Sequence, residues 1–213
     1  MGLLDDTLTL DMVRSALSGC SARPGDPGTN GPRDYDAPAT GGGAGRRAAV
    51  MVIVHGPRER PTVVMTVKSA YLPLHAGEIA FPGGKAEEVD ESLLHTALRE
   101  TFEEVGLSID SKHVMGGLSP VSTLSSGFVI APYLAVLDGT PTLKPNSEVA
   151  EILRIPLGAL LDSVASDDDP EHGAMHDMYT FEHTVTGGRK VWGASARILK
   201  QIHDELAVPG PRA

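Results

Sequence analysis

The chain has 213 residues, of which 41% are hydrophobic and 22% are charged, an ordinary composition for a globular protein. Its net charge of −10 argues against a surface that binds nucleic acid, because a phosphate backbone requires a basic partner. A single cysteine, Cys20, excludes an internal disulfide and favours a reducing compartment.

The beginning of the chain and its apolar runs bear on where in the cell the protein is expected. The beginning, MGLLDDTLTLD, is acidic and amphipathic and differs from a signal peptide. No run approaches the roughly 20 apolar residues that a transmembrane helix needs. We therefore expect a cytoplasmic protein with no membrane partner.

The first 46 residues divide into two parts. Residues 5–18 predict an amphipathic helix with Leu8, Met12, Ala16 and Leu17 on one stripe, so residues 1–18 form an expected N-terminal packing element. Dimerisation through this helix is the alternative, which would give a homodimer. Residues 19–46 are dense in Gly and Pro and predict a linker or mobile loop. No apolar strand precedes the glycines at 41–43, so they do not indicate a phosphate-binding loop.

Residues 47–207 carry the pattern of one mixed α/β domain. Strands are expected at 47–54, 62–67 and 79–81, with a tight loop at 81–84 where backbone can approach a ligand closely. A helix is expected at about 91–105, with Asp90 as its N-cap and Gly106 just after its last turn.

The second half of this domain alternates in the same way. Strands are expected at 113–118 and 128–137, joined by a polar segment, 119–127, that either faces substrate or only connects them. A short helix at 156–161, a hairpin over 177–192 and a terminal helix at 194–206 follow. The histidines at 172, 176 and 183 lack a metal-ligand spacing and are interpreted as surface residues.

The helix at 91–105 gathers three carboxylates. Glu100, Glu103 and Glu104 stand at i, i+3 and i+4, and at ~100° per residue they span only about 100° of the helix. The opposite side is expected to pack against the sheet through four apolar residues, Leu94, Leu98, Phe102 and Val105.

These carboxylates repel one another and lie near the helix C-terminus, where the dipole disfavours anions. A hard divalent cation such as Mg²⁺ or Mn²⁺ would resolve both conflicts. The alternative is a solvated acidic face, which is common on surface helices. The glycine loop and the helix stop that flank the cluster favour the metal site.

This segment resembles the signature of the Nudix hydrolases, which is a glycine, five residues, a glutamate, seven residues and R-E-U-x-E-E-x-G-U, with U apolar. Residues 99–107, RETFEEVGL, match its second half, with Thr101 at the first apolar position. Glu91 lies eight residues before Arg99, as the signature requires, whereas Gly84 precedes Glu91 by one residue too many.

The longer glycine loop resembles the coenzyme A pyrophosphatase branch of that family, whose acidic positions are similar to Glu87 and Asp90. The branch also carries the pattern T-x-R-S-x-x-L-R-x-H-x-G-E-V-A-F-P-G-G, which residues 66–84 follow. The departures are Lys68 and Pro73, both where the pattern has arginine. Residues 191–202, VWGASARILKQI, are similar to the last helix of this branch, which an aromatic-glycine pair opens.

The resemblance implies a Nudix-type α/β/α sandwich with a mixed β-sheet between helices, and a metal site on the acidic helix. Glu100 and Glu104 are the expected ligands of Mg²⁺ or Mn²⁺, and Glu103 is either a third ligand or the general base. Arg99 is expected to pair with a carboxylate and hold it in place.

Three further groups complete the expected site. Lys68 would hold substrate phosphate, and Gly83 and Gly84 would let the loop pack closely around the site. Nudix proteins often bring another acid from a distal loop, for which Glu148 is a better candidate than Glu151. The alternative is that both are surface charges.

The implied reaction is metal-dependent hydrolysis of the diphosphate of coenzyme A or its acyl derivatives, giving (acyl-)4′-phosphopantetheine and adenosine 3′,5′-bisphosphate. One alternative, motivated by Pro73, is a broader pyrophosphatase acting on ADP-ribose, NADH or nucleoside triphosphates. Another is a catalytically silent Nudix fold that senses a nucleotide, although such proteins usually lose the carboxylates retained here.

Overall fold

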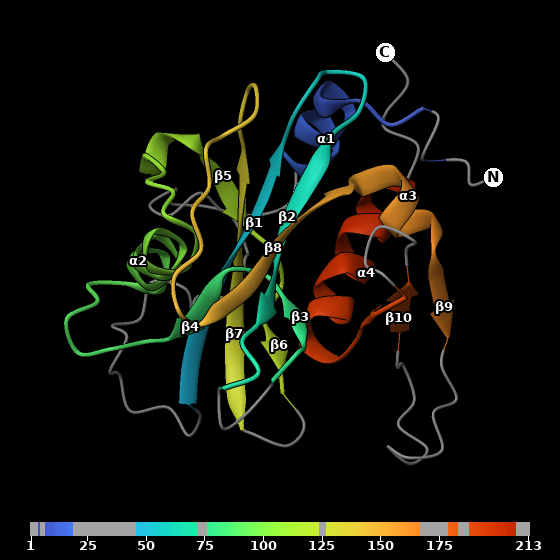
Figure 1. The fold of residues 1–213 in the computed structure, drawn as a ribbon. Coiled ribbons are helices and arrows are strands. Elements are labelled where there is room, and N and C mark those ends of the chain that lie inside the picture. Colours follow the sequence, from blue (N-terminus) through green and yellow to red (C-terminus); the bar gives the residue numbers. More distant parts are fainter. Residues whose placement is uncertain are drawn as a thin grey trace.

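The computed structural model describes residues 4, 7–18, 46–71, 76–123, 127–166, 179–182 and 188–207. A central sheet lies between helix α2 on one side and helices α3 and α4 on the other (Figure 1). This confirms the expected mixed α/β sandwich. The interpretations placed on residues 19–45, on Pro73 and on the three histidines at 172, 176 and 183 fall outside the described residues.

The central sheet is mixed because β1 pairs in parallel with β7, while its other described pairs are antiparallel. The strand order is β3-β2-β1-β7-β5, with β4 pairing β1, β6 pairing β7 and β8 pairing β2. Among the described residues its eight strands are β1 Arg46–His55, β2 Thr62–Lys68, β3 Ile79–Ala80, β4 Gly83–Lys85, β5 Val114–Gly117, β6 Val121–Ser122, β7 Phe128–Val136 and β8 Val149–Pro156.

The strands β1, β2, β3, β5 and β7 confirm the expected ones, whereas β4, β6 and β8 are additions. The sequence around β8 was interpreted only as a distal loop with two acids, because Glu151 and Arg154 interrupt its apolar residues. Pairing with the long apolar strand β2, over Val149 to Pro156, gives this segment its structure. The sheet thus brings the turn before β8 beside the end of β2.

A second sheet contains β9 Val164–Ser166, β10 Tyr179–Glu182 and β11 Lys190–Val191. The antiparallel pairing of β10 with β11 confirms the expected hairpin, although its turn lies outside the described residues. Phe181 and Val191 bury their side chains in the same core as helix α4. This small sheet therefore extends the layer that covers one face of the central sheet.

The helices are α1 Leu10–Leu17, α2 Leu93–Val105, α3 Leu157–Asp162 and α4 Gly193–Ala207, with a 3-10 turn η1 at Ser111–His113. The short helix and the terminal helix confirm the expectations for 156–161 and 194–206. None of the helices in the described part of the chain combines the length and the apolar character needed to cross a membrane.

Helix α1 begins later than expected, and its buried stripe differs. Thr9 caps it by accepting a hydrogen bond from the Met12 backbone N–H, so residues 7–9 stay outside the helix. Leu10, Val13 and Leu17, at i, i+3 and i+7, face the core, whereas Met12 is 45% exposed. The expected stripe is therefore wrong at Met12, because the face that meets the core runs through Leu10 and Val13, although Leu8 and Leu17 are buried as expected.

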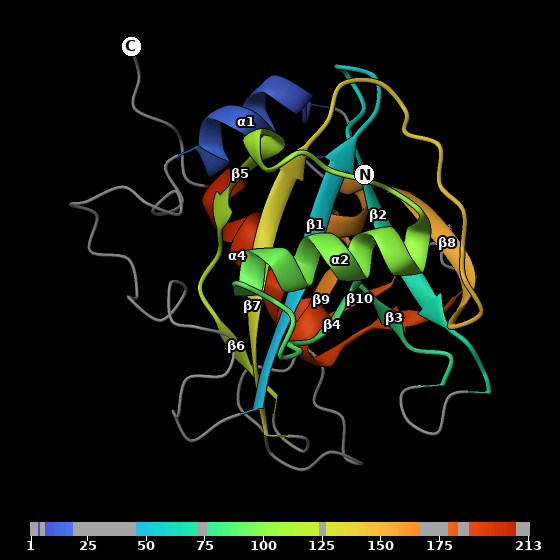
Figure 2. The same cartoon turned by 90° about the vertical axis from the view of Figure 1, so that its left-hand side faces the viewer.

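Helix α2 lies across the face of the sheet over β1 and β7 (Figure 2). Its N-cap is Ser92, which accepts a 3.1 Å hydrogen bond from the His95 N–H, so the expectation of Asp90 as N-cap is wrong. Gly106 confirms the expected stop: it is left-handed, at φ 68°, and its N–H donates to the Phe102 carbonyl oxygen.

The sheet-facing side of α2 also differs from the expectation. Leu93 is buried, and Glu104 follows it by 11 residues, about three turns plus 20°, so both side chains lie on the same face. Phe102 lies about 180° from Leu93 and is 59% exposed. The expected packing through Phe102 is wrong, and one of the three carboxylates belongs to the buried face. Leu94 and Leu98 are only partly buried against the core, and Val105 is buried as expected.

Candidate active site

The expected glycine loop at 81–84 is partly a strand. Gly83 and Gly84 belong to β4 and pair with Val50 and Ala49 of β1. A Cβ on Gly83 would lie 2.4 Å from the Ala49 carbonyl oxygen, and one on Gly84 would lie 2.5 Å from the Glu100 carboxylate. Only glycine at these two positions therefore lets β4 lie against both β1 and the acidic helix.

Glu104 is the buried carboxylate of the site, only 2% exposed. The Lys68 ammonium forms an ion pair with its Oε1, and the Gly83 N–H donates to its Oε2 over 3.3 Å. Burial raises the pKa of Glu104; the charge and hydrogen bond of Lys68 and the Gly83 N–H oppose this rise, and the charge of Glu148 adds to it. The end of β2 and the start of β4 thus converge on this side chain.

Arg99 connects the other carboxylates, as the sequence analysis expects. Its Nε and Nη2 donate to the two oxygens of Asp90, each over 2.9 Å, in a bidentate pair. Its Nη1 donates to Glu100 over 2.9 Å and to Glu103 over 3.2 Å. Nη2 also donates to the Lys85 carbonyl oxygen. The guanidinium is therefore fixed on several sides and holds Glu100 in place.

Asp90 holds the Arg99 guanidinium from the loop that precedes α2. It is buried and also accepts hydrogen bonds of 2.9 Å from the Glu87 N–H and the Thr96 hydroxyl. Burial alone would raise its pKa, but the hydrogen bonds from Arg99, Glu87 and Thr96 lower the pKa of Asp90 to about 2. Asp90 is therefore ionised at neutral pH and orients the Arg99 guanidinium.

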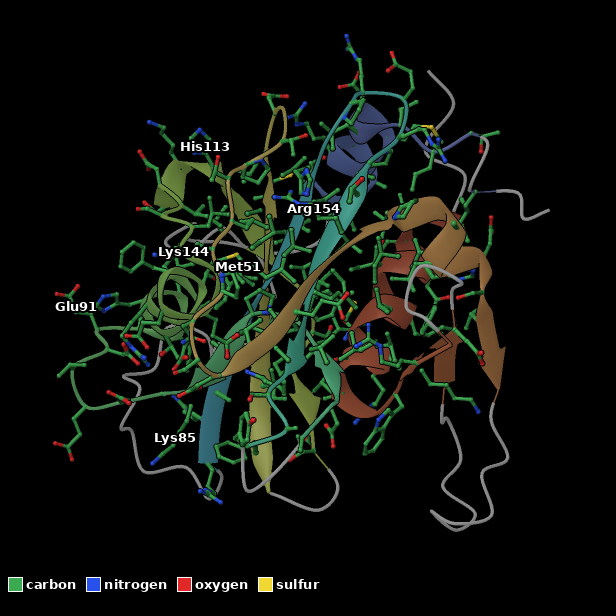
Figure 3. The ribbon with its side chains drawn as sticks, viewed as in Figure 1. Met51, Lys85, Glu91, His113, Lys144 and Arg154 are labelled. Atoms are coloured by element: carbon green, nitrogen blue, oxygen red, sulfur yellow. The ribbon has the colours of Figure 1, made fainter. Side chains whose placement is uncertain are left out.

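Glu100 and Glu103 differ in their surroundings. The Glu100 side chain is 14% exposed and that of Glu103 is 51% exposed. Burial raises the pKa of Glu100, the Arg99 charge opposes this, and the charges of Glu104 and Glu103 raise it further. By contrast, Glu91, the remaining glutamate of the signature, lies at the outer side of the molecule beside α2 (Figure 3).

The turn before β8 carries the candidate distal acid. The backbone N–H groups of Lys144 and Asn146 donate to the carbonyl oxygens of Val105 and Glu104, which closes the C-terminus of α2. The Glu148 N–H donates to the Asn146 side chain over 2.9 Å, and the Glu148 carbonyl oxygen accepts from Ser69. Glu148 thus stands close to Glu104.

Glu151, the second distal acid, lies within β8. Its carboxylate pairs with Arg189 at 2.8 Å, which connects the central sheet to the start of β11. This contact is about 50% exposed on the glutamate side and has the character of a surface ion pair. Of the two distal acids, Glu148 is the one whose charge raises the pKa of Glu104, whereas Glu151 is paired with Arg189.

The residues suit a hard divalent cation by their chemistry. Burial raises the pKa values of both Glu100 and Glu104, and neighbouring carboxylates raise them further, Glu104 and Glu103 at Glu100 and Glu148 at Glu104. A divalent ion would relieve that penalty. As placed among the described residues, no three His, Cys, Asp or Glu side chains converge closely enough to hold a metal ion. Instead, Lys68 and Arg99 supply the positive charge.

Two contributions to the site escaped the sequence analysis. Asp90 was assigned to the helix cap, although its distance of nine residues from Arg99 brings it alongside the guanidinium once Ser92 caps α2. No role was expected for Asn146. An asparagine two residues before Glu148 is a signal for a side-chain-stabilised turn, which here presents that glutamate.

Comparison with known proteins agrees with the fold. The NUDIX domain family model matches residues 45–177, more than half of the chain. The Nudix hydrolase NudL of Yersinia pestis (strain Pestoides F) is 34% identical over 166 residues, covering 76% of this chain and 81% of that protein. NudL of Yersinia pseudotuberculosis serotype O:1b (strain IP 31758) gives the same values.

Among solved structures, a MutT/nudix family protein from Enterococcus faecalis superposes with a TM-score of 0.53 at 18% identity. The match covers 74% of this chain and 60% of that one, and it supports the fold. The chain therefore belongs to the Nudix family. It is a hydrolase of the kind that cleaves diphosphate bonds, a class that generally uses divalent metal ions.

Proposed function

We propose that this enzyme hydrolyses the diphosphate of coenzyme A or its acyl derivatives, using Mg²⁺ or Mn²⁺. The observation that carries the proposal is a convergence within the pattern at residues 66–84. Lys68 near its beginning and Gly83 near its end both contact the Glu104 carboxylate. The segment that resembles the coenzyme A branch therefore contacts the candidate site near both of its ends.

The roles of the carboxylates follow from their positions. Glu100 and Glu104 hold the divalent ion, and Arg99 orients Glu100 through Nη1 while Asp90 fixes the guanidinium. A bound ion supplies charge neutralisation for the diphosphate and a polarised attacking water. Gly84 leaves room for Glu100 to stay beneath β4.

The reaction adds the oxygen of water to one phosphorus and breaks its bond to the bridging oxygen. The proton of the water passes to a carboxylate of the site. Glu103, which is half exposed and bonded to Arg99, is one candidate base or a third ligand. Glu148 is the additional acid. The products are (acyl-)4′-phosphopantetheine and adenosine 3′,5′-bisphosphate.

A broader pyrophosphatase acting on ADP-ribose, NADH or nucleoside triphosphates is the second candidate. Pro73 favours it, because the coenzyme A pattern has a cation at this position. A silent nucleotide sensor is disfavoured, since Glu100, Glu103 and Glu104 are all retained.

A substrate panel with Mg²⁺ or Mn²⁺, followed by chromatography of the products, tests the proposal. We expect coenzyme A to yield adenosine 3′,5′-bisphosphate faster than the other dinucleotides are cleaved. Glu104→Gln should reduce the rate by more than the roughly 10- to 100-fold that loss of an outer partner of a ligand costs. Glu59→Gln, at an exposed turn, is the matched control and should retain the activity. Good turnover of ADP-ribose without cleavage of coenzyme A would favour the second candidate.

A further inference from the structure

Both carboxylate oxygens of Glu104 already have a donor within the protein. Lys68 occupies Oε1 as an ammonium, and the Gly83 N–H occupies Oε2. Because Glu104 is only 2% exposed, its charge depends on these two groups rather than on water. A divalent cation that binds Glu104 is repelled by the Lys68 ammonium on the same carboxylate, so the two cations compete for it.

The two donors differ in their freedom to move. The Gly83 N–H belongs to the backbone of β4, which is paired with Val50 and confined by the carbonyl oxygen of Ala49. The Lys68 ammonium ends a flexible four-carbon side chain, whose backbone is held by hydrogen bonds with Glu78 and Gly77. Lys68 can leave Glu104 by rotating its side chain, without disturbing the sheet.

Glu100 offers a contrast within the same site. Its Oε1 accepts from Arg99, which Asp90 and the Lys85 carbonyl oxygen hold firmly. Among the described residues, no donor is found for its Oε2. A cation can therefore bind Glu100 at an oxygen that has no donor in the described part of the chain, whereas at Glu104 it meets the Lys68 ammonium.

We propose that Lys68 is an exchangeable counter-ion of Glu104. In the metal-free enzyme its ammonium neutralises the buried carboxylate. When the divalent ion binds, Lys68 leaves Glu104 and becomes available to the anionic substrate. The inference rests on the proposed function only in taking Glu104 as a metal ligand, and it makes Lys68 a determinant of metal affinity.

The identity of the side chain at position 68 matters for this exchange. Lysine carries a compact point charge that makes a single contact here. Arginine could bind both oxygens of a carboxylate in a planar fork and would be harder to displace. Methionine has similar length without charge. The affinity for a divalent ion should therefore be highest in Lys68→Met, intermediate in wild type and lowest in Lys68→Arg.

Binding of Mn²⁺ to the full-length protein, followed at pH 8 by electron paramagnetic resonance of the free ion, measures this order without any substrate. We expect Lys68→Met to bind Mn²⁺ about tenfold more tightly than wild type, a typical size for coupling between two binding events. Lys68→Arg should bind more weakly than wild type. Lys112→Met is the matched control, because Lys112 forms an exposed ion pair with Asp110.

Thermal unfolding gives a second measurement. Without its counter-ion Glu104 is left buried and unpaired, so Lys68→Met should unfold at a lower temperature than wild type in chelator. Saturating Mn²⁺ should restore more of its stability than it adds to wild type. Should Lys68→Met fail to fold in chelator, Lys68→Gln serves for both measurements and should also bind Mn²⁺ more tightly.

The outcomes separate the two proposals. Wild-type binding that Glu104→Gln weakens, together with tighter binding by Lys68→Met, supports the exchange. Wild-type binding that Glu104→Gln weakens but Lys68→Met leaves unchanged overturns the exchange alone. Absence of wild-type binding, or binding indifferent to Glu104→Gln, overturns the proposed metal site and the exchange with it.

Discussion

The Glu100 carboxylate fills the space that a side chain at Gly84 would need. A Cβ on Gly84 would lie 2.5 Å from the Glu100 carboxylate carbon and from its Oε1. Gly84 cannot retreat, because β4 is paired with β1 at Ala49. Glu100 is equally constrained, since Arg99 bonds its carboxylate. The position of a candidate metal ligand is thus fixed jointly by a strand and by a helix.

Gly84→Ala is expected to displace Glu100. Overpacking of this kind typically costs about 1–3 kcal/mol of unfolding free energy. A shift of about 1 Å in a reacting group can cost 10²-fold, so we expect a comparable fall in kcat/KM. Chemical denaturation and steady-state kinetics would measure the two effects.

A double-mutant cycle identifies the cause. Glu100→Asp shortens the side chain and opens the space that the new methyl group needs. Gly84→Ala should therefore destabilise the Glu100→Asp protein less than the wild type. Equal destabilisation in both backgrounds would show that Glu100 is not what the methyl group meets.

Asp90→Asn is expected to destabilise the protein at neutral pH. The pKa of Asp90 lies at about 2 in the folded protein against an ordinary value of 3.8, because hydrogen bonds from Arg99, Glu87 and Thr96 outweigh the effect of burial. This difference corresponds to about 2 kcal/mol of stability. Since the folded pKa is lowered, the contribution is present above pH 4 and is lost as the pH falls towards 2. Denaturation between pH 7 and pH 2 would measure it.

Comparing the stability of wild type and Asp90→Asn across this pH range tests whether the ionised Asp90 is the source of the effect. The stability difference between wild type and Asp90→Asn should shrink as the pH falls through this range. Glu59→Gln, which removes a carboxylate at an exposed turn, should follow the wild-type profile closely. A difference between wild type and Asp90→Asn that is constant with pH would rule out the ionised Asp90 as its source.

The sequence was informative where the structure depends on local periodicity. The end of α2 at Gly106 follows from the need for a left-handed residue after the last turn, and the acidic spacing follows from 3.6 residues per turn. Phe102 was misplaced because hydrophobicity alone does not decide which of two faces a helix buries. The chain instead buries Glu104, whose partner Lys68 lies 36 residues away.

Contacts between distant segments account for the rest. The turn at 146–148 bonds both to the end of α2 and to Ser69 at the end of β2, and this closes the site from a third direction. No pattern within residues 146–148 indicates those partners. The position of Asp90 likewise depends on where the helix begins, which Ser92 decides by a difference of two residues.

Asn146→Ala tests whether this turn positions Glu148. The substitution removes the side-chain acceptor of the Glu148 N–H but keeps the Asn146 backbone N–H that bonds Glu104. We expect a fall in kcat/KM of about 10-fold, the lower end of what losing a supporting contact costs. The stability should fall by only about 1 kcal/mol. Asn146→Asp retains an acceptor and should keep most of the activity.

Non-additivity distinguishes positioning from a general loss of order. If Asn146 acts through Glu148, the effect of Asn146→Ala on kcat/KM should nearly vanish in a Glu148→Gln background. If instead the two substitutions reduce kcat/KM independently, so that their factors multiply, the turn matters for another reason, such as closing the end of α2.

His55, at the end of β1, is buried on the α2 side of the sheet and only 2% exposed. Its Nε2 lies 3.0 Å from Nη1 of Arg154, whose Nη2 donates to the Pro141 carbonyl oxygen. Because arginine can only donate, Nε2 accepts, and the imidazole is neutral. Burial, and then the charge of Arg154, lower the pKa of His55 to about 4, and among the described residues its buried Nδ1 has no hydrogen-bond partner.

The depressed pKa of His55 predicts an acid-sensitive stability. The unfolded chain protonates this histidine below about pH 6.5, whereas the folded protein resists until about pH 4, so stability is full above 6.5 and falls between these values. The loss amounts to about 3 kcal/mol.

His55→Gln keeps an acceptor for Arg154 but does not titrate, so it should lose about that much less stability than wild type between pH 7 and pH 4 in urea denaturation. His113→Gln, at an exposed histidine, should track wild type. Parallel profiles for wild type and His55→Gln would refute a neutral, buried imidazole.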